Sequence, residues 1–421
     1  MTATILEICF WASAAPVVYT YVLYPLALAC AARFCGRQVK RERFTGNVSI
    51  VLAAHNEAGR IAARRDELAS LLTSAGIDGE VLIVSDGSDD GTAAAARDGA
   101  PAHVRIIELT ENVGKARALN HGCAAATGDV LVFADARQRW APDALPLLLE
   151  SFADTTVGGT SGDLCLESAP GITAGVGLYW RYEKTIRKLE SRIHSTVGAT
   201  GAICACRRHL FRPIPPRTIL DDVYGPMQVV MQGYRVIHDA RAQAFDRLPI
   251  KSRDEFRRKV RTLSGNFQLA TSVPALLLPI RNPVWIQFLS HKLLRLAVPW
   301  LLIVLLVSSA LVPKTFYRAA LAVQALGYLV ALAGFSSRVA SRSRLVSAAA
   351  SFLVLNAAAW MGFWVWVRGG AGTSWRKVTY EPTPSCGATR PGAAAQDIHA
   401  ESFLRTPDVN HQSRVHNELM S

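Results

Sequence analysis

The chain has 421 residues and a net charge of +13, half of its residues are hydrophobic, and its mean hydropathy is +0.19. That hydropathy is high for a purely soluble protein, and the apolar excess lies in blocks near the two ends, which indicates membrane segments. The positive charge suits lipid headgroups or phosphates. Nucleic-acid binding is disfavoured, because the sequence contains no recognised binding module and no basic-aromatic pattern.

The first apolar block covers residues 5–32, and its one charged residue is Glu7. A block of this length spans a bilayer. A cleaved signal peptide is the alternative, but the block is too long and lacks a basic amino-terminal region. Basic residues follow at positions 33–43, so the positive-inside rule predicts that this flank is cytoplasmic and that the amino terminus faces out. We expect residues 1–34 to contain a transmembrane helix.

The next part of the chain alternates short apolar runs with polar and helical segments. A helix is expected at 61–74 and another begins within 111–122, and the expected strands are 47–54, 80–86, 103–109 and 130–134. This alternation predicts a mainly parallel sheet with helices on both faces. The glycine patterns of dinucleotide-binding and P-loop proteins do not occur, which argues against both classes.

The fourth expected strand, Val130–Ala134, ends abruptly on Asp135. Five apolar residues followed by a carboxylate are typical of a buried strand that presents the carboxylate at its carboxyl end. Ligands of open α/β sheets bind beyond the carboxyl ends of the strands. Asp135 is therefore the first residue to which we assign a chemical role.

The middle of the chain mixes strands and helices. A strand is expected at 157–166 and a helix at 177–193, followed by a glycine-rich, then strand-like segment at 198–208. A loop carrying Asp221 and Asp222 precedes a further helix and strand. Residues 252–269 form a basic amphipathic stretch, and helices of this kind commonly lie on a membrane surface.

The last third contains three more candidate spans, Leu293–Leu311, Ala319–Phe335 and Val346–Val367, after an interfacial segment at 284–292. Four spans in total would place the carboxyl tail outside, in agreement with a cytoplasmic loop at Arg338, Arg342 and Arg344. Arg368, Arg376 and Lys377 argue for the opposite side, so the side of the tail stays open. The tail from 379 is polar and is expected to be disordered.

Taken in order, these motifs resemble those of membrane-embedded family-2 glycosyltransferases, in particular the bacterial poly-N-acetylglucosamine, cellulose and hyaluronan synthases. The resemblance covers about residues 46–370 and rests on a series of motifs rather than on one. It implies an α/β fold of the GT-A type with a mainly parallel sheet, flanked by transmembrane helices. The implied divisions are an N-terminal helix, a cytoplasmic catalytic domain, interfacial and transmembrane helices, and a tail, at 1–34, 46–270, 284–370 and 379–421.

The resemblance implies that a nucleotide-sugar donor binds at the carboxyl ends of the first strands. Asp86, in VSDGSDDGT, would contact the base or ribose, and Asp90 belongs to the same motif. Ala54 and Glu57 would line the nucleotide pocket, and Lys115, near a helix start, would meet the pyrophosphate. Structural alternatives remain: an ordinary Asp-Gly turn for Asp86, a helix cap for Glu57 and an exposed surface lysine for Lys115.

Asp135 corresponds by resemblance to the first aspartate of the family's D-x-D motif, whose carboxylates hold Mg²⁺ or Mn²⁺ against the diphosphate. Here the motif reads Asp-Ala-Arg, and Arg137 cannot ligate a metal. Its side chain would pair with a donor phosphate or a carboxylate, or point away. The resemblance still implies a divalent cation at Asp135, completed by phosphate oxygens, water or another residue.

Asp221 and Asp222 match the family's [T/E]-D motif, whose last aspartate is the general base. By resemblance, Asp222 would take the proton from the acceptor hydroxyl while that oxygen attacks the anomeric carbon in line, which inverts the anomeric centre. Asp221 would raise the pKa of its neighbour through like charge. The alternative is a pair of residues that caps the following helix.

Arg258 and Arg261 resemble the R-x-x-R part of a [Q/R]-x-x-R-W motif, with Thr262 in place of the Trp. Three residues apart on a helix, they share a face and could neutralise the departing nucleoside diphosphate. A helix that only contacts lipid headgroups is the alternative. Weaker candidates for acceptor binding are Trp180, for which core packing is equally plausible, and Thr200 and Gly201.

With this resemblance, the sequence is expected to encode an inverting, multi-pass glycosyltransferase of the bacterial inner membrane. It would move a sugar from UDP-N-acetylglucosamine or UDP-glucose to a glycan or lipid acceptor in cell-surface polysaccharide synthesis. One alternative is a lipid-directed enzyme that adds a single sugar, which the missing Trp mildly favours. Another is a catalytically silent GT-A membrane scaffold, which Arg137 keeps open. A transporter or channel is disfavoured by the long soluble stretch between the apolar blocks.

Overall fold

The computed structural model describes residues 2–167, 174–247, 252–335 and 343–370. These residues belong to one compact unit, Met1–Tyr380. The tail expected to be disordered lies outside the described residues, as do four of the basic residues used to orient the spans, Arg338, Arg342, Arg376 and Lys377.

The described residues form an eight-stranded sheet in the order β3-β2-β1-β4-β7-β6-β8-β5. Neighbours β3 to β4 are parallel, as are β6 and β8, whereas β7 runs antiparallel to both of its neighbours and β5 runs antiparallel to β8. The mainly parallel sheet predicted from the sequence is confirmed. The strands are β1 Val48–Ala54, β2 Gly79–Asp86, β3 Val104–Leu109, β4 Val130–Ala134, β5 Arg139–Trp140, β6 Val157–Glu167, β7 Ile203–Arg207 and β8 Arg235–Arg247.

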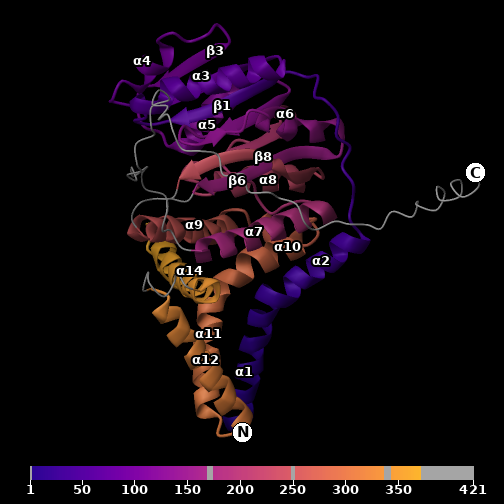
Figure 1. Ribbon diagram of the computed structural model, residues 1–421, viewed down its shortest axis with the longest axis vertical. Helices are drawn as coiled ribbons and strands as arrows, with labels where there is room; N and C mark the ends of the chain where they lie inside the picture. Colours follow the sequence, from indigo (N-terminus) through magenta and orange to yellow (C-terminus); the bar gives the residue numbers. More distant parts are fainter. Residues whose placement is uncertain (1, 168–173, 248–251, 336–342, 371–421) are drawn as a thin grey trace, which may run out of the picture. The chain divides into compact units, whose positions relative to one another are not determined.

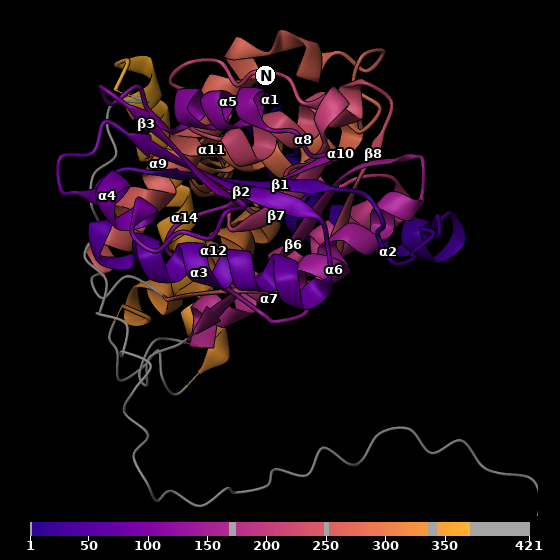
Figure 2. The ribbon, with the colours of Figure 1, turned by 90° about the horizontal axis from the view of Figure 1, so that it is seen from above.

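Both faces of the sheet are covered by helices, and this is why its central strands are apolar throughout. All seven residues of β1 are buried. Ile50 and Leu52 face one hydrophobic core and Val51 and Ala53 face the other, since side chains alternate across a strand. Figure 2 shows the two layers. The helices are α3 Ala58–Ala75 and α6 Ala144–Leu149 on the first face, and α5 Lys115–Ala125 and α8 Asp221–Met231 on the second.

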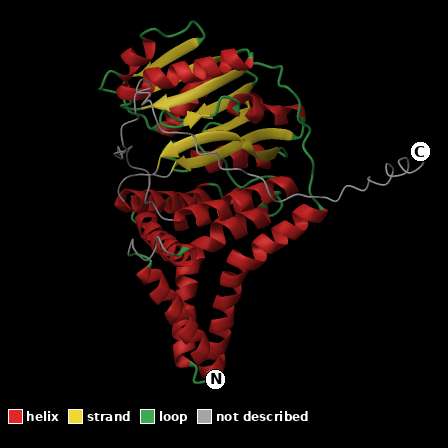
Figure 3. Cartoon of the chain, viewed as in Figure 1, coloured by secondary structure: helices red, strands yellow, loops and turns green. Residues whose placement is uncertain are grey.

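Two long amphipathic helices, α7 Ala174–Ile193 and α9 Ser252–Ser272, lie between the sheet and the apolar helices (Figures 1 and 3). Both were expected from the sequence. Short helices complete the domain: α4 Thr92–Arg97, η2 Glu150–Ala153, η3 Arg208–Leu210 and η4 Pro274–Leu277.

In the described part of the chain, four helices are long and apolar enough to cross a membrane: Ala3–Phe34, Trp285–Leu311, Thr315–Ala333 and Leu345–Val367. They are built from α1 Thr2–Val18, η1 Tyr19–Leu23, α2 Tyr24–Phe34, α10 Trp285–Phe288, η5 Leu289–Leu293, α11 Leu294–Leu311, α12 Thr315–Ala333 and α14 Arg344–Val367. The segment 284–292, expected to be interfacial, is continuous with the following helix, because the π-helical turn η5 joins α10 to α11. Its interfacial position stays a prediction.

Three of these helices, α1, α11 and α12, run side by side away from the sheet (Figure 1). Phe10 of α1 is buried against Val312 and Tyr317, with its ring 4.8 Å from that of Tyr317. Their outer faces expose large apolar side chains such as Trp11 and Leu329. Exposed apolar surface of this extent is expected of helices surrounded by lipid.

A buried polar network joins the apolar helices to α7. Glu190, fully buried on α7, accepts a hydrogen bond from the Tyr24 hydroxyl at 2.7 Å and lies 2.9 Å from Nδ1 of His291. Nε2 of His291 is 3.0 Å from Glu183, which also pairs with Arg295. Each charged group in the network faces a group of opposite charge or a hydrogen-bond donor, as buried charges require. The network therefore fixes α7 to the first two spans.

Candidate functional site

A cavity lies at the carboxyl end of β4 and brings together five of the residues singled out from the sequence: Lys115, Asp135, Gly201, Asp221 and Asp222. They come from four places in the fold: the start of α5, the end of β4, the turn before β7 and the start of α8. The antiparallel pairing of β7 with β4 sets Ile203 opposite Ala134, and this register carries Gly201 to the end of β4.

The ammonium of Lys115 lies between two carboxylates. Its Nζ is 3.0 Å from Oδ1 of Asp135 and 3.1 Å from Oδ2 of Asp221. Burial alone would lower the pKa of the ammonium, but the two carboxylates outweigh it and hold the pKa of Lys115 well above its ordinary value. Lys115 is therefore a permanent positive charge within the cavity.

The second aspartate of the pair, Asp222, has the electrostatics of a proton acceptor. Burial, and then the charge of Asp221, raise its pKa to about 6, against the lowering effect of Lys115, Lys292 and Arg187. A carboxyl group with this pKa is ionised at neutral pH and accepts a proton more readily than an ordinary aspartate. The sequence predicted the direction of this shift but assigned it to Asp221, whereas burial is the larger cause.

The turn at residues 198–201 forms one wall of the cavity. A Cβ atom added at Gly201 would lie 3.7 Å from Cβ of Asp222, 3.8 Å from Nζ of Lys115 and 3.9 Å from Oδ2 of Asp135. The turn is fastened on both sides: the Ala199 amide donates to the Asp222 carbonyl at 2.7 Å, and the buried Thr200 donates its amide to Oγ of Ser161 at 3.0 Å. Gly201 thus leaves space directly in front of the three charged groups.

The predicted nucleotide residue Asp86 is fully buried at the end of β2. Its two carboxylate oxygens accept hydrogen bonds from the amides of Val113 and Gly114 at 2.8 and 2.9 Å. Asp86 therefore shapes the turn that presents Lys115, and it does not line the cavity. Contact between Asp86 and a donor stays a prediction.

The other predicted donor residues lie in the neighbouring loops. Ala54 is buried at the end of β1. Asp90 accepts hydrogen bonds from the amides of Ala58 and Thr92 at 3.2 and 3.0 Å, and so links the starts of α3 and α4. Glu57 occupies the position before α3, where its side chain pairs with Arg60 at 3.0 Å. Their contacts order the loops beside β1 and β2.

Arg137 pairs with a carboxylate, which was one of the alternatives that the sequence left open. Its Nε and Nη2 lie 3.0 and 2.6 Å from the two oxygens of Asp246 on β8, which also accepts from Gln138 at 3.1 Å. On the other side of the loop, Nε of Arg64 donates to the Asp135 carbonyl at 3.2 Å. The loop that carries Asp135 is thus held from two directions.

The residues at this loop do not make up a metal site by themselves. Within the described ranges, no group of three or more His, Cys, Asp or Glu side chains could hold a metal ion. Asp135 supplies one carboxylate, and Lys115 already contacts it. At the second position of the motif, Arg137 supplies a cation in place of a ligand. Divalent cations in proteins are held by several oxygen ligands, so the protein part of the expected set is incomplete.

Arg258 and Arg261 do not line the cavity. Arg258 is half-buried and Arg261 is exposed. The helix that carries them reaches the site through other residues. Gln268 accepts from the Ile219 amide at 3.0 Å and donates to the Arg217 carbonyl at 2.9 Å.

The close contact of α9 with the loop before Asp221 depends on a glycine. A Cβ atom at Gly265 would come within 2.7 Å of Cγ of Leu220 and 2.9 Å of Cγ2 of Ile219. Sequence reasoning missed Gly265 and Gln268, because the arginine spacing drew attention to the charged face of the helix. A glycine and a glutamine side chain in the middle of an expected helix could have indicated a close contact at this position.

Trp180 packs in the core, which was the alternative to acceptor binding. Its indole N–H donates to the Leu164 carbonyl at 2.9 Å, and the ring packs against the first core.

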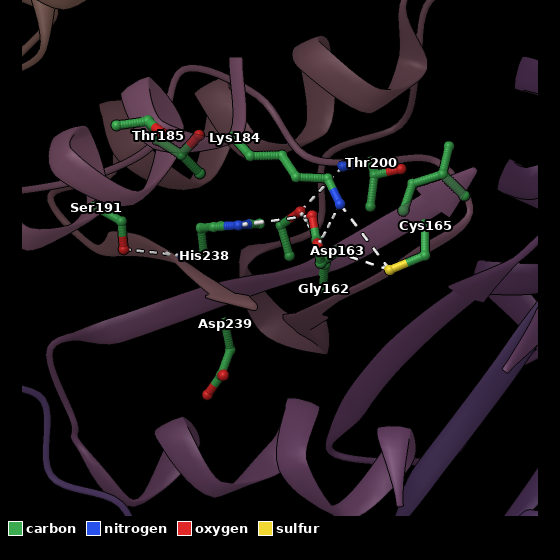
Figure 4. Close-up of polar contacts among 12 residues, drawn as sticks. Gly162, Asp163, Cys165, Lys184, Thr185, Ser191, Thr200, His238 and Asp239 are labelled. Carbon is green, nitrogen blue, oxygen red and sulfur yellow. Dashed lines mark hydrogen bonds and ion pairs between the residues drawn. The ribbon is translucent and has the colours of Figure 1, made fainter. Parts of the chain in front are cut away.

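A second polar cluster fixes α7 to the sheet (Figure 4). Lys184 reaches from α7 to Asp163 of β6 at 2.6 Å, and Asp163 lies 4.0 Å from Nε2 of His238. Burial, aided by Arg187, lowers the pKa of His238 to about 4, so this ring is neutral. The cluster borders Thr200 and supports the wall of the cavity (Figure 4).

Comparison with known proteins assigns the fold. Residues 49–213, which contain Asp86, Lys115, Asp135 and Gly201, match the profile of the family described as Glycosyl transferase family 2. The chain carries a glycosyltransferase family 2 domain. Asp221 and Asp222 lie outside the matched region, shortly after its end at residue 213.

Three curated relatives are similar to parts of this chain. A dolichyl-phosphate beta-glucosyltransferase of Drosophila melanogaster is 40% identical over 98 residues, 21% of this chain and 30% of its own length. An undecaprenyl-phosphate 4-deoxy-4-formamido-L-arabinose transferase of Sodalis glossinidius is 27% identical over 39% of this chain and 48% of its own. A poly-beta-1,6-N-acetyl-D-glucosamine synthase of Staphylococcus epidermidis is 23% identical over 53% of this chain and 55% of its own. The chain thus spans between 30% and 55% of the length of these relatives.

A solved structure extends the likeness to the whole fold. It is the mannosyltransferase PcManGT from Pyrobaculum calidifontis, in complex with GDP-Man and Mn²⁺. It superposes with a TM-score of 0.65 over 86% of this chain and 99% of its own, at 23% identity. At that identity the likeness concerns the fold alone, and it confirms the GT-A fold class predicted from the sequence.

Proposed function

We propose that this protein is an inverting glycosyltransferase that moves a sugar from a nucleotide-sugar donor to a lipid or glycan acceptor at a membrane surface. The observation that carries the proposal is the cavity at the end of β4. There the glycine turn at Gly201 leaves room for a reacting sugar within reach of Asp222, Lys115 and Asp135. A buried carboxylate opposite a fixed cation suits a reaction that takes up a proton on one side and releases an anion on the other.

In the proposed reaction, Asp222 accepts the proton of an acceptor hydroxyl. The hydroxyl oxygen forms a bond to the anomeric carbon, and the bond between that carbon and the phosphate oxygen breaks. The nucleoside diphosphate leaves with the bonding electrons. Its negative charge faces Lys115 and the amino-terminal end of α5, where the helix dipole adds positive potential. Asp221 orients Lys115 and helps to keep Asp222 basic.

The choice of donor and acceptor rests on the relatives. UDP-N-acetylglucosamine and UDP-glucose are the donors predicted from the sequence, and the names of the synthase and the glucosyltransferase support them. The GDP-Man in the similar structure adds guanosine donors to the candidates. Dolichyl-phosphate and undecaprenyl-phosphate enzymes support a lipid acceptor and a single addition, in line with Thr262 in place of the family's Trp. A glycan acceptor is supported by the synthase.

For location, we propose a multi-pass protein of the bacterial inner membrane, with residues 46–270 as a cytoplasmic catalytic domain. Four helices of sufficient length and the basic flank at 33–43 support this orientation. The sequence also predicts Mg²⁺ or Mn²⁺ at Asp135. A metal there would depend on donor phosphates and water for most of its ligands, and no step above requires it.

The proposal is tested with purified protein in lipid nanodiscs. A panel of UDP- and GDP-sugars is offered with polyprenyl phosphate or oligosaccharide acceptors, and released nucleoside diphosphate and glycosylated product are both measured. We expect turnover of one donor with one acceptor class and inversion at the anomeric carbon. Retention of configuration would refute the assigned mechanism. Binding of UDP or GDP without turnover of any pair would favour the silent scaffold.

A further inference from the structure

Lys115 is positioned to bind negatively charged groups in the cavity. The ammonium contacts carboxylates from two other elements, Asp135 at 3.0 Å and Asp221 at 3.1 Å. It therefore lies between the strand end that the D-x-D motif occupies and the helix start that presents Asp222. A bridging cation in a site of this kind neutralises both carboxylates and leaves its remaining N–H group for a further anion.

The D-x-D motif beside Lys115 also carries a positive charge in this chain. Arg137 stands where the motif has its second aspartate, and its guanidinium is held by two contacts to Asp246, which is almost fully buried. Bidentate pairs of this geometry are among the strongest side-chain contacts. Arg137 is therefore anchored as a cation, and the nearby carboxylate of Asp246 is committed to it and to Gln138.

A divalent metal on Asp135 would compete with Lys115. Metal–oxygen bonds to carboxylates are roughly 2.0–2.6 Å long, so a metal on Oδ1 of Asp135 would lie within a few ångströms of an ammonium that contacts the same oxygen. Two cations at that separation repel each other strongly in a buried site. Lys115 would have to leave, and Asp221 would lose its partner. Among the described residues, no group of three or more His, Cys, Asp or Glu side chains could hold a metal ion, so no ready ligand set would compensate for the lost contacts of Lys115.

We propose that the ammonium of Lys115 is the cation that faces the donor diphosphate in this chain, so that donor binding and sugar transfer do not require a divalent metal. The proposal rests on the proposed function. As the bond between the anomeric carbon and the phosphate oxygen breaks, the charge that develops on the leaving diphosphate meets Lys115 and the start of α5. The proton of the acceptor goes to Asp222. The positive charge is thus covalently part of the chain and is present in every catalytic cycle.

The first test uses the full chain in nanodiscs, stripped of metals with EDTA. Binding of UDP and GDP is measured by calorimetry, with EDTA or with added Mn²⁺, and Mn²⁺ binding is followed by electron paramagnetic resonance. We expect the nucleotide affinity to agree within about twofold between the two conditions. We also expect the protein with nucleotide to bind no more Mn²⁺ than the same concentration of nucleotide binds in solution without protein. Turnover of the accepted donor is likewise expected to persist in EDTA. Loss of binding or turnover in EDTA, restored by Mn²⁺ or Mg²⁺, would overturn the proposal.

Substitutions separate the charge from the fold. Lys115→Met should lower turnover by about 10²–10³-fold, as for other groups that stabilise charge developing in a transition state, and should weaken nucleotide binding. Lys115→Arg retains the charge and should retain nucleotide binding. Lys188→Met removes an exposed lysine of α7 and serves as the control. Equal nucleotide binding in Lys115→Met and the control would refute the assignment. Absence of nucleotide binding and turnover in the wild type under every condition would instead refute the proposed function itself.

Discussion

Asp222 is the residue on which the proposed chemistry depends most directly. Asn has nearly the same shape but cannot take up the proton, so Asp222→Asn should lower kcat by about 10²–10⁴-fold. Because the base acts in the transition state, the affinity for UDP or GDP should stay within a few-fold. Single-turnover rates and equilibrium nucleotide binding, measured on the same preparation, check both parts. A large loss of nucleotide binding would show that Asp222 serves the donor instead.

The raised pKa of Asp222 predicts a pH dependence. Above about pH 6 the group is a carboxylate and can accept the proton; below that value it is protonated, and kcat should fall by about tenfold per pH unit. Burial of the carboxyl group and the charge of Asp221 raise the pKa of Asp222. The positive charges of Lys115, Lys292 and Arg187 lower it. A kcat profile between pH 4.5 and 8 measures it. A flat profile to pH 4.5 would exclude Asp222 as the base.

For single residues, the sequence predicted positions along the chain better than long-range contacts. Asp135 and the aspartate pair could be located because each follows or precedes a clear element, and the structure brings them together with Lys115. The partner of Arg137 could not be predicted, because Asp246 is 109 residues away and meets it through the edge of the sheet. Asp86 was identified from its motif, but its burial and its backbone contacts depend on the loop at 113–114.

At the scale of elements, α9 acts through its contact with the loop at 217–220. Gln268 makes two hydrogen bonds to that loop, and each such bond contributes about 1 kcal/mol. Gln268→Ala should therefore loosen the start of α8 and lower kcat by about five- to thirtyfold, with a smaller effect on nucleotide affinity. Steady-state kinetics check the difference, with the exposed Thr271→Ala as the control on the same helix. Equal loss in both variants would place the effect in the helix as a whole.

The elements themselves could be predicted to a large extent. Parallel central strands are buried on both faces, so β1, β2 and β4 appear in the sequence as continuous apolar runs. The course of β8 to Arg247 and its pairing with β5 could not be predicted, because their residues alternate with charged ones and the pairing is long-range. The order of β7 and β6 in the sheet likewise follows from tertiary packing.

At the scale of the molecule, the network of Glu190, Glu183 and His291 ties the long apolar helices to α7 and so to the sheet domain. Leaving a buried hydrogen-bond donor without its acceptor costs about 1–3 kcal/mol. Glu190→Ala should therefore lower the apparent melting temperature in detergent by several degrees, because Tyr24 and His291 lose their acceptor. Glu108→Ala breaks an exposed ion pair with Arg97 and should leave the temperature nearly unchanged. Equal shifts would contradict the assigned role of the network.

The same network has a consequence for biosynthesis. A ribosome releases Tyr24 first, Glu190 follows 166 residues later, and His291 appears only after a further 101. Domains generally begin to fold from the amino terminus during translation, yet Glu190 and Glu183 meet His291 and Arg295 only when the helix at 285–311 has been made. On the proposed membrane location, the side of the domain that α7 lines would complete its contacts only after this later segment has entered the membrane, so that the protein would mature in a fixed order.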